Sequence, residues 1–326
     1  MNSFNRKNVA VIGGAGMIGT ALCKKLLSVN ASVHIIDNFS RGRSRIGGAN
    51  VHLCDATSID DLSNVISTIK PEYVFNLAAH VAGVEYNQSN QLEMYTMNTL
   101  LQTVPLLACE RAGVRNFLQT SSVCVYGATA QNSATETYLG GDPVSANIGY
   151  SLAKRNGEKA VEMSSIQRAV VVRPTNTFGI FDYYDKRAHV IPALIKKLLS
   201  ADKVMEVNGS PDVVREFIFA DDVADAMMLA MLNGNNRWAY NIGTGGETAV
   251  SIGDLVEIMM DVSGIYKKVK WVDDFDGGDD RRSTNNERIR SIGFRHSVSL
   301  RDGIEMSMND YKWRIKSIVT NSNRWS

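Results

Sequence analysis

The stretch VAVIGGAGMIG, residues 9–19, decides the fold of this chain. Its four apolar residues predict a short buried strand, and residues 20–27 after it have helical periodicity. Gly13, Gly16 and Gly19 have the spacing GxxGxxG, a variant of the fingerprint that gives a tight turn, close backbone approach to a pyrophosphate and close helix packing. The helix N-terminus offers free N–H groups to phosphates. The stretch predicts a dinucleotide-binding turn, and a glycine-rich turn without a ligand is the alternative.

A second strand, residues 31–36, ends at Asp37, where a carboxylate can accept hydrogen bonds from an adenosine ribose. A carboxylate at this position repels a 2′-phosphate, which favours NAD over NADP. Arg41, Arg43 and Arg45 follow within one loop and leave NADP open, because any of them could turn toward a phosphate. A solvated basic loop is the other interpretation of these arginines.

Strands and helices alternate without a break in composition up to about residue 176. This alternation predicts an α/β fold of the Rossmann type, a doubly wound parallel sheet with the cofactor across the carboxyl ends of its strands. From about residue 177 the pattern loosens. We expect three parts: an NAD(P)-binding domain with the catalytic groups (1–176), a smaller C-terminal α/β substrate lobe (177–315), and a frayed polar tail (316–326).

Composition narrows the classes of partner. The 326 residues are 44% hydrophobic and carry a formal net charge of +1, which gives no indication of nucleic acid or of an anionic membrane as a partner. No apolar run approaches the roughly 20 residues that a membrane span needs. The N-terminus leads directly into the first strand without room for a signal peptide, so we expect a cytoplasmic protein.

The four cysteines and five histidines show no metal-ligand spacing. The cysteines lie at 23, 54, 109 and 124 without a CxxC pair, and the histidines are scattered. Neither a disulfide framework nor a metal site is therefore predicted.

Two separated stretches supply proton-transfer chemistry: TSSVCVYG at 120–127 and YSLAK at 150–154. The i, i+4 spacing places Tyr150 and Lys154 on one helix face. A nearby ammonium favours a phenolate, so we expect that a tyrosine with an unperturbed pKa of about 10 acts as a base near neutral pH, beside the hydroxyl of Ser122. Taken alone, YxxxK also occurs by chance in many helices.

The ordered set of motifs resembles the extended short-chain dehydrogenase/reductases that act on nucleotide-linked sugars. The motifs are GGAGMIG, NLAAH (76–80), TSSVCVYG, YSLAK, RPTNTFG (173–179), REFIFADDVADA (215–226) and YNIGTG (240–245). The resemblance implies that members commonly form homodimers through the helix near 91–111 and the helix bearing Tyr150. It also implies these cofactor contacts: Gly13, Gly16, Met17, Ile18, Gly19, Asp37, Asn38, Asp55, Ala56, Leu77, Ala78, Ala79, Asn98, Thr120, Tyr150, Lys154 and Pro174.

For the substrate, the resemblance implies that Ser122 and Tyr150 hold the sugar's 4-oxygen. The nucleotide diphosphate would contact Asn176, Lys197, Arg215, Arg281 and Arg282. Arginines suit this task because the guanidinium is a permanent cation with forked donors for phosphate.

Within the family, the second half is most similar to the GDP-L-fucose synthase group. That group exchanges protons at C3 and C5 of a 4-keto sugar with a cysteine two residues after the catalytic serine and a histidine that opens a helix of the substrate lobe. Cys124 and His189 occupy these places. A 4-ketone acidifies the C3 and C5 hydrogens, and inversion needs one group to remove a proton and another to deliver one. A packing cysteine and a helix-capping histidine are the alternatives.

Two departures from that group, and one difference from the dehydratases of the family, limit the expectation. Fucose synthases generally use NADPH, whereas Asp37 and its loop resemble the NAD-retaining epimerases. Asn208 replaces a tryptophan, and Val123-Cys124 replaces the Asp-Glu pair of dehydratases, which disfavours loss of water.

We expect an NAD(P)-dependent 3,5-epimerase of a GDP-linked hexose, with 4-reduction as an added option. Two alternatives stay open: a UDP-hexose 4-epimerase of the glucose or glucuronate type, and a catalytically idle cofactor-binding regulator. The intact trio of Ser122, Tyr150 and Lys154 argues against the regulator.

Overall fold

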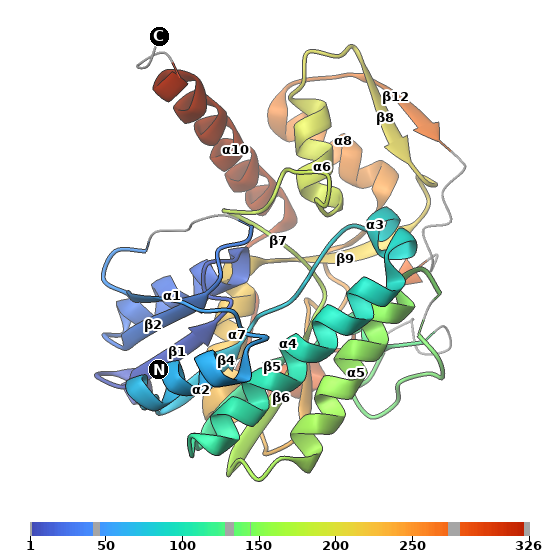
Figure 1. Cartoon of the computed structure of the whole chain (residues 1–326). Helices are drawn as coiled ribbons and strands as arrows, with labels where there is room; N and C mark the ends of the chain where they lie inside the picture. The colour runs from blue at the N-terminus through green and yellow to red at the C-terminus, as the bar shows by residue number, and fades with distance from the viewer. Residues whose placement is uncertain (1, 42–45, 128–133, 144, 273–280, 323–326) are drawn as a thin grey trace.

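The computed structural model describes residues 2–41, 46–127, 134–143, 145–272 and 281–322. Within these ranges the chain forms a seven-stranded parallel sheet with helices on both faces and a second, smaller lobe that contains α6, α8, β8 and β12 (Figure 1). The predicted α/β doubly wound architecture is confirmed.

The main sheet has the order β10-β6-β5-β4-β1-β2-β3. Its strands are parallel, so their carboxyl ends lie along one edge, and both neighbours of β1 pair with it in register (Val11 with Ile35 and with Phe75). The strands are β1 (Asn8–Ile12), β2 (Ser32–Asp37), β3 (Asn50–Leu53), β4 (Tyr73–Asn76), β5 (Asn116–Thr120), β6 (Arg168–Pro174) and β10 (Ala239–Ile242).

Each face of this sheet has its own apolar core. On one face α1 (Met17–Ser28) packs with α7 (Ala220–Asn233), and on the other lie α2 (Ile59–Ile69), α4 (Gln91–Arg111) and α5 (Ile148–Met163). The central strands are apolar on both sides, as expected for a parallel sheet that helices cover twice. Helix α3 (Val84–Ser89) precedes α4.

The second lobe is built around β9 (Val214–Phe219), which pairs with β7 (Asn176–Phe178), β11 (Ala249–Ser251) and β13 (Arg281–Arg282). A separate parallel pair joins β8 (Val204–Asn208) to β12 (Lys268–Val272). Phe178, Ile195 and Leu255 belong to the core of this lobe. Its helices are α6 (Val190–Leu198), α8 (Ile252–Ser263) and α10 (Leu300–Ser322), whereas α9 (Glu287–Ser291) packs on β10 of the main sheet and buries Ile289 in the core that α1 and α7 cover.

The chain crosses between the two halves more often than the sequence pattern indicates. Strand β10 and helix α7 come from the segment expected to form the substrate lobe, yet β10 is the edge strand of the main sheet beside β6, and α7 packs on α1. The reason is physical: β10 pairs in parallel with β6, and the face next to α1 needs a second helix to bury its apolar residues.

The expected frayed tail is wrong for residues 316–322. Helix α10 continues to Ser322, and in Figure 1 it projects away from the body of the molecule. The Ser299 hydroxyl accepts the N–H of Asp302 at 3.1 Å near its start, and Arg314 pairs with Asp310 one turn earlier at 2.6 Å. Both contacts stabilise a helix. Residues 323–326, the acidic stretch 273–280, Arg43 and Arg45 lie outside the described residues.

No helix among the described residues is long and apolar enough to cross a membrane.

Candidate active site

The turn between β1 and α1 forms a cradle because its glycines lack side chains. Gly13 has φ +78°, and a Cβ on it would lie 2.7 Å from the backbone nitrogen of Ala78. A Cβ on Gly19 would overlap the carbonyl oxygen of Gly13. Helix α1 begins at Met17, so Met17 and Ile18 bring the unpaired N–H groups of its first turn to the cradle. These features fit the pyrophosphate of a dinucleotide.

Asp37 ends β2 beside this cradle. Its carboxylate accepts the N–H of Ala15 at 3.0 Å and the N–H of Phe39 at 2.8 Å. These two bonds fix the carboxylate at the carboxyl edge of the sheet, where a ribose diol could bind and a 2′-phosphate would be repelled.

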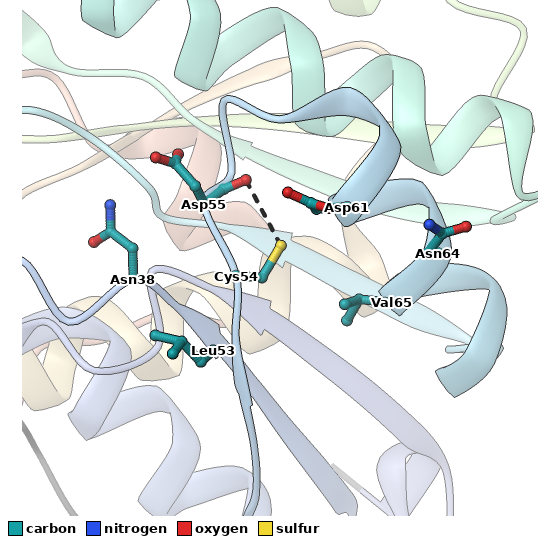
Figure 2. Close-up of a pocket in the computed structure, with 7 residues that line it drawn as sticks. All are labelled: Asn38, Leu53, Cys54, Asp55, Asp61, Asn64 and Val65. Atoms are coloured by element: carbon teal, nitrogen blue, oxygen red, sulfur yellow. Dashed lines mark hydrogen bonds between the residues drawn. The ribbon is translucent and has the colours of Figure 1, made fainter.

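A hollow of about 480 Å³ lies next to Asn38, between the end of β3 and helix α2 (Figure 2). Leu53 and Val65 supply apolar surface, while Asp55 turns its carboxylate to accept the N–H and hydroxyl of Thr57 at 2.9 and 2.8 Å. The mixture of apolar walls and a polar rim suits a flat base such as adenine. The residues that line the hollow are Asn38, Leu53, Cys54, Asp55, Asp61, Asn64 and Val65. Ala56, directly after Asp55, is buried.

Beyond β4, residues Leu77, Ala78 and Ala79 lead to a loop that Asn98 holds. The Asn98 amide oxygen accepts the N–H of His80 at 3.0 Å, and its nitrogen donates to the His80 carbonyl at 2.9 Å. Asn98 therefore fixes the loop at the cradle, and a direct cofactor contact from it stays a prediction.

The proton-transfer residues converge where β5 ends and α5 begins. Lys154 donates to the carbonyl of Thr120 at 2.8 Å and lies 5.5 Å from the centroid of the Tyr150 ring. The Ser122 hydroxyl bonds to the Tyr150 hydroxyl and accepts the N–H of Cys124 at 3.2 Å. Four of the five predicted catalytic residues thus form one group, with Pro174 at the end of the neighbouring strand β6.

The prediction that Lys154 lowers the pKa of Tyr150 is wrong when only the protein's own residues act on it. Burial raises the pKa of the Tyr150 hydroxyl, and the neighbouring Cys124 raises it further, while the bond from Ser122 lowers it in part. Burial also lowers the pKa of Lys154 to about 7, against the influence of Cys124 and Glu158. The cost of placing both groups away from water therefore exceeds the benefit of their proximity.

A buried ion pair behind these residues was not anticipated. Arg173 on β6 donates to both carboxylate oxygens of Glu158 at 2.8 and 2.6 Å, and the Ser121 hydroxyl donates to the same carboxylate at 2.5 Å. Glu158 follows Lys154 by four residues on α5, so the helical spacing from Tyr150 through Lys154 could have revealed it. The Arg173–Glu158 ion pair therefore holds Ser121, the residue that precedes Ser122.

His189, the fifth predicted catalytic residue, lies on the substrate lobe at the start of α6. It occupies the N-cap position of α6 without a side-chain capping bond and is exposed at the surface. Surrounding protein nevertheless lowers its pKa to about 4, and the Arg41 cation contributes. His189 is therefore neutral near pH 7.

The predicted diphosphate ligands lie on elements of the substrate lobe: β7, α6, β9 and β13. Asn176 donates to the carbonyl of Glu216 at 2.9 Å, and Lys197 donates to the carbonyl of Glu206 at 2.8 Å. The backbones of Arg215 and Arg282 pair directly across β9 and β13, with Arg281 one residue earlier. The strands thus place these arginines side by side, while Lys197 contacts β8.

Among the described residues, no group of three or more histidine, cysteine, aspartate or glutamate side chains could hold a metal ion. No disulfide bond joins any two of the four cysteines.

Comparison with known proteins identifies the family. The model of the NAD dependent epimerase/dehydratase family matches residues 9–243. The chain belongs to this family. It is 28% identical over 323 residues to GDP-L-fucose synthase 1 of Arabidopsis thaliana, covering 95% of this chain and 94% of the relative, and 28% identical over 321 residues to a GDP-L-fucose synthase of Sinorhizobium fredii, covering 95% and 97%.

Solved structures share the fold. The UDP-glucose 4-epimerase of Thermotoga maritima with UDP-glucose superposes with a TM-score of 0.86 at 23% identity, covering 94% of this chain and 99% of that one. The expected family and the NAD(P) dependence of the enzyme are confirmed. The cradle, Asp37 and the hollow beside Asn38 would hold the dinucleotide.

Proposed function

We propose that this enzyme is a nucleotide-sugar epimerase that inverts C3, C5 or both in a GDP-linked hexose through a 4-keto intermediate. The observation that carries the proposal is the position of Cys124. Its N–H bonds to the Ser122 hydroxyl, which in turn bonds to Tyr150, and its thiol is close enough to raise the pKa of the Tyr150 hydroxyl. A GDP-linked substrate is supported by the relatives at 28% identity, which are GDP-L-fucose synthases.

The first task of the site is proton transfer at the sugar's 4-oxygen. A dinucleotide held by the cradle and Asp37 would supply a hydride acceptor for C4 and a positively charged nicotinamide ring. Tyr150 takes the O4 proton as the ketone forms and gives it back when the alcohol is restored, with Ser122 as a hydrogen-bond partner of O4. A positive charge near Tyr150 would oppose the effect of burial on its pKa, and protonated Lys154 supplies one.

The second task is proton exchange next to the ketone. One of Cys124 and His189 removes a proton from C3 or C5 to form an enolate, and the other delivers a proton to the opposite face, so the count of protons is unchanged. Neutral His189 can accept a proton, and the thiol of Cys124 can donate one. Asn176, Arg215, Arg281 and Arg282 would bind the diphosphate, with Lys197 at the edge of the lobe.

The alternative is a UDP-hexose 4-epimerase, in which the 4-keto sugar turns over before hydride returns. The two bonds that fix Asp37 for a ribose diol favour NAD, the cofactor that such an enzyme needs. In that case Cys124 and His189 take no part. A 4-reductase activity would instead require NADPH.

The test is incubation of the protein with NAD and a panel of GDP- and UDP-linked hexoses and 4-keto hexoses in deuterated water. We expect solvent deuterium at C3 or C5 of a GDP sugar, because enolisation exchanges that proton. Inversion at C4 without deuterium would establish the 4-epimerase instead. No turnover of any sugar while NAD binds would establish the idle regulator.

We also propose that the enzyme is a homodimer. The outer faces of α4 and α5 expose six large apolar side chains, and a second copy would cover them: Leu92, Tyr95, Leu100, Leu107, Ile148 and Met163. Leu92 and Met163 are 78% and 81% exposed, which is costly for a monomer. Sedimentation of the parent should give a dimer, and L92E/M163K should give a monomer. A cytoplasmic location stays a prediction.

A further inference from the structure

Arg41 lies where the cofactor half and the substrate lobe meet. One terminal nitrogen donates to the carbonyl of Val81 at 2.9 Å, and the other lies 3.2 Å from the carboxylate of Asp185. Its guanidinium also lies 4.0 Å from the centroid of the Tyr183 ring. Only 12% of the side chain is exposed. Arg41 belongs to the loop that follows Asp37, yet its side chain contacts Asp185 and Tyr183 on the substrate side.

Two of these partners, Asp185 and Tyr183, belong to a segment, residues 181–189, that lies against the dinucleotide cradle. At one end the Tyr183 hydroxyl is 3.9 Å from where a Cβ on Gly16 would lie. At the other end Gly83 donates its N–H to the carbonyl of Arg187 at 3.2 Å, and a Cβ on Gly83 would lie 3.0 Å from the carbonyl oxygen of Ala188. The same segment thus borders the pyrophosphate position and leads directly into His189.

The contacts of the Arg41 side chain also bear on the choice between NAD and NADP. An arginine that binds a 2′-phosphate needs a guanidinium free to turn toward the adenosine ribose. Both terminal nitrogens of Arg41 are instead directed to Val81 and Asp185, and Asp37 keeps a carboxylate at the ribose position.

We propose that Arg41 is a positioning residue that fastens segment 181–189 over the bound dinucleotide, so that the cofactor stays through many turnovers. Release of the cofactor then requires the Arg41–Asp185 contact and the stacking on Tyr183 to open. The inference rests on the proposed function, in which hydride taken from C4 returns to the same sugar. A retained cofactor suits that cycle, whereas a reductase must exchange its cofactor at each turnover.

The test measures cofactor release directly. The protein is loaded with NADH, mixed with excess NAD, and the loss of bound NADH fluorescence gives the dissociation rate. We expect R41Q and D185N each to release NADH about tenfold faster than the parent, the size expected when a charge-assisted contact closing the site is lost. K186Q, which removes a cation from the same segment but no contact of Arg41, is the matched control and should match the parent.

Two further variants separate fastening from general disorder. D185E keeps the carboxylate and should restore slow release, while R41K keeps the charge without the fork and should fall between the parent and R41Q. Equal release rates for the parent, R41Q and D185N would overturn the inference. Because release needs no sugar, this result is independent of the deuterium experiment, so either proposal can fail while the other holds.

Discussion

The two halves of the molecule shape their binding surfaces by opposite means. In the dinucleotide half, the cradle exists because Gly13 and Gly19 have no side chains, so the backbone of the turn packs directly on Ala78 and on α1. In the substrate lobe, one buried side chain organises the loops: Glu216 accepts the N–H of Thr284 at 2.8 Å and the hydroxyl of Thr244 at 3.0 Å. The first surface depends on local chain geometry, and the second depends on contacts between distant residues.

The largest effect should come from Tyr150, on α5 in the dinucleotide half. Y150F removes the hydroxyl that exchanges the O4 proton and should lower turnover about 10³-fold, within the usual range for general acid–base catalysis. Binding of NAD should change little, because the ring remains in place. Steady-state turnover and NAD titration measure the two quantities. A variant with more than a tenth of the parent's activity would show that another group transfers this proton.

The next effect tests the dinucleotide half. G19A places a methyl group against the Gly13 carbonyl and should lower the free energy of unfolding by about 2 kcal/mol and weaken NAD binding, because the turn must shift. G47A is the matched control, since nothing lies within 4 Å of a Cβ there. Denaturant unfolding and NAD titration measure both. Equal NAD affinity in G19A and G47A would mean that the cradle does not depend on this close approach.

The substrate lobe should respond differently. E216Q replaces a charged acceptor of several N–H and O–H bonds by an amide and should cost about 2 kcal/mol of stability, with a higher KM for the nucleotide sugar and an unchanged affinity for NAD. E206Q, which removes one exposed ion pair with Lys270, should leave the free energy of unfolding nearly unchanged. Loss of NAD affinity in E216Q would contradict the separation of the two halves.

The smallest effect concerns pH. Burial lowers the pKa of Lys154 to about 7, below its ordinary value of 10.5, so between these values the unfolded chain binds one more proton than the folded chain. Stability contributed by this group therefore rises with pH, by up to about 1.4 kcal/mol per unit. The parent should gain stability relative to K154M between pH 7.5 and 8.5. Parallel pH dependences in denaturant unfolding would show that Lys154 titrates normally.

Local pattern was enough to predict the main sheet and most of the cofactor side. The glycine spacing, the strand that ends at Asp37 and the i, i+4 pair of Tyr150 and Lys154 all act over a few residues, so short-range sequence carries them. The same reasoning placed His189 at the start of a helix, as the structure shows.

Features that depend on distant contacts were missed. Nothing near β10 in the sequence indicates that it pairs with β6, and the fastening of Arg41 to Asp185 joins residues 144 apart. The raised pKa of Tyr150 was missed for a similar reason. Spacing reveals that Lys154 is near, but not that both groups are buried or that the ammonium donates to Thr120.

The account depends most directly on the thiol of Cys124 as a proton-transfer group. The decisive measurement compares deuterium incorporation at C3 and C5 of a GDP-linked 4-keto hexose by C124S and by C109A, whose cysteine lies buried in the core and away from the site. We predict that C124S loses at least about 10²-fold in exchange rate, while C109A exchanges like the parent. Exchange by C124S at the parent's rate would contradict the assignment.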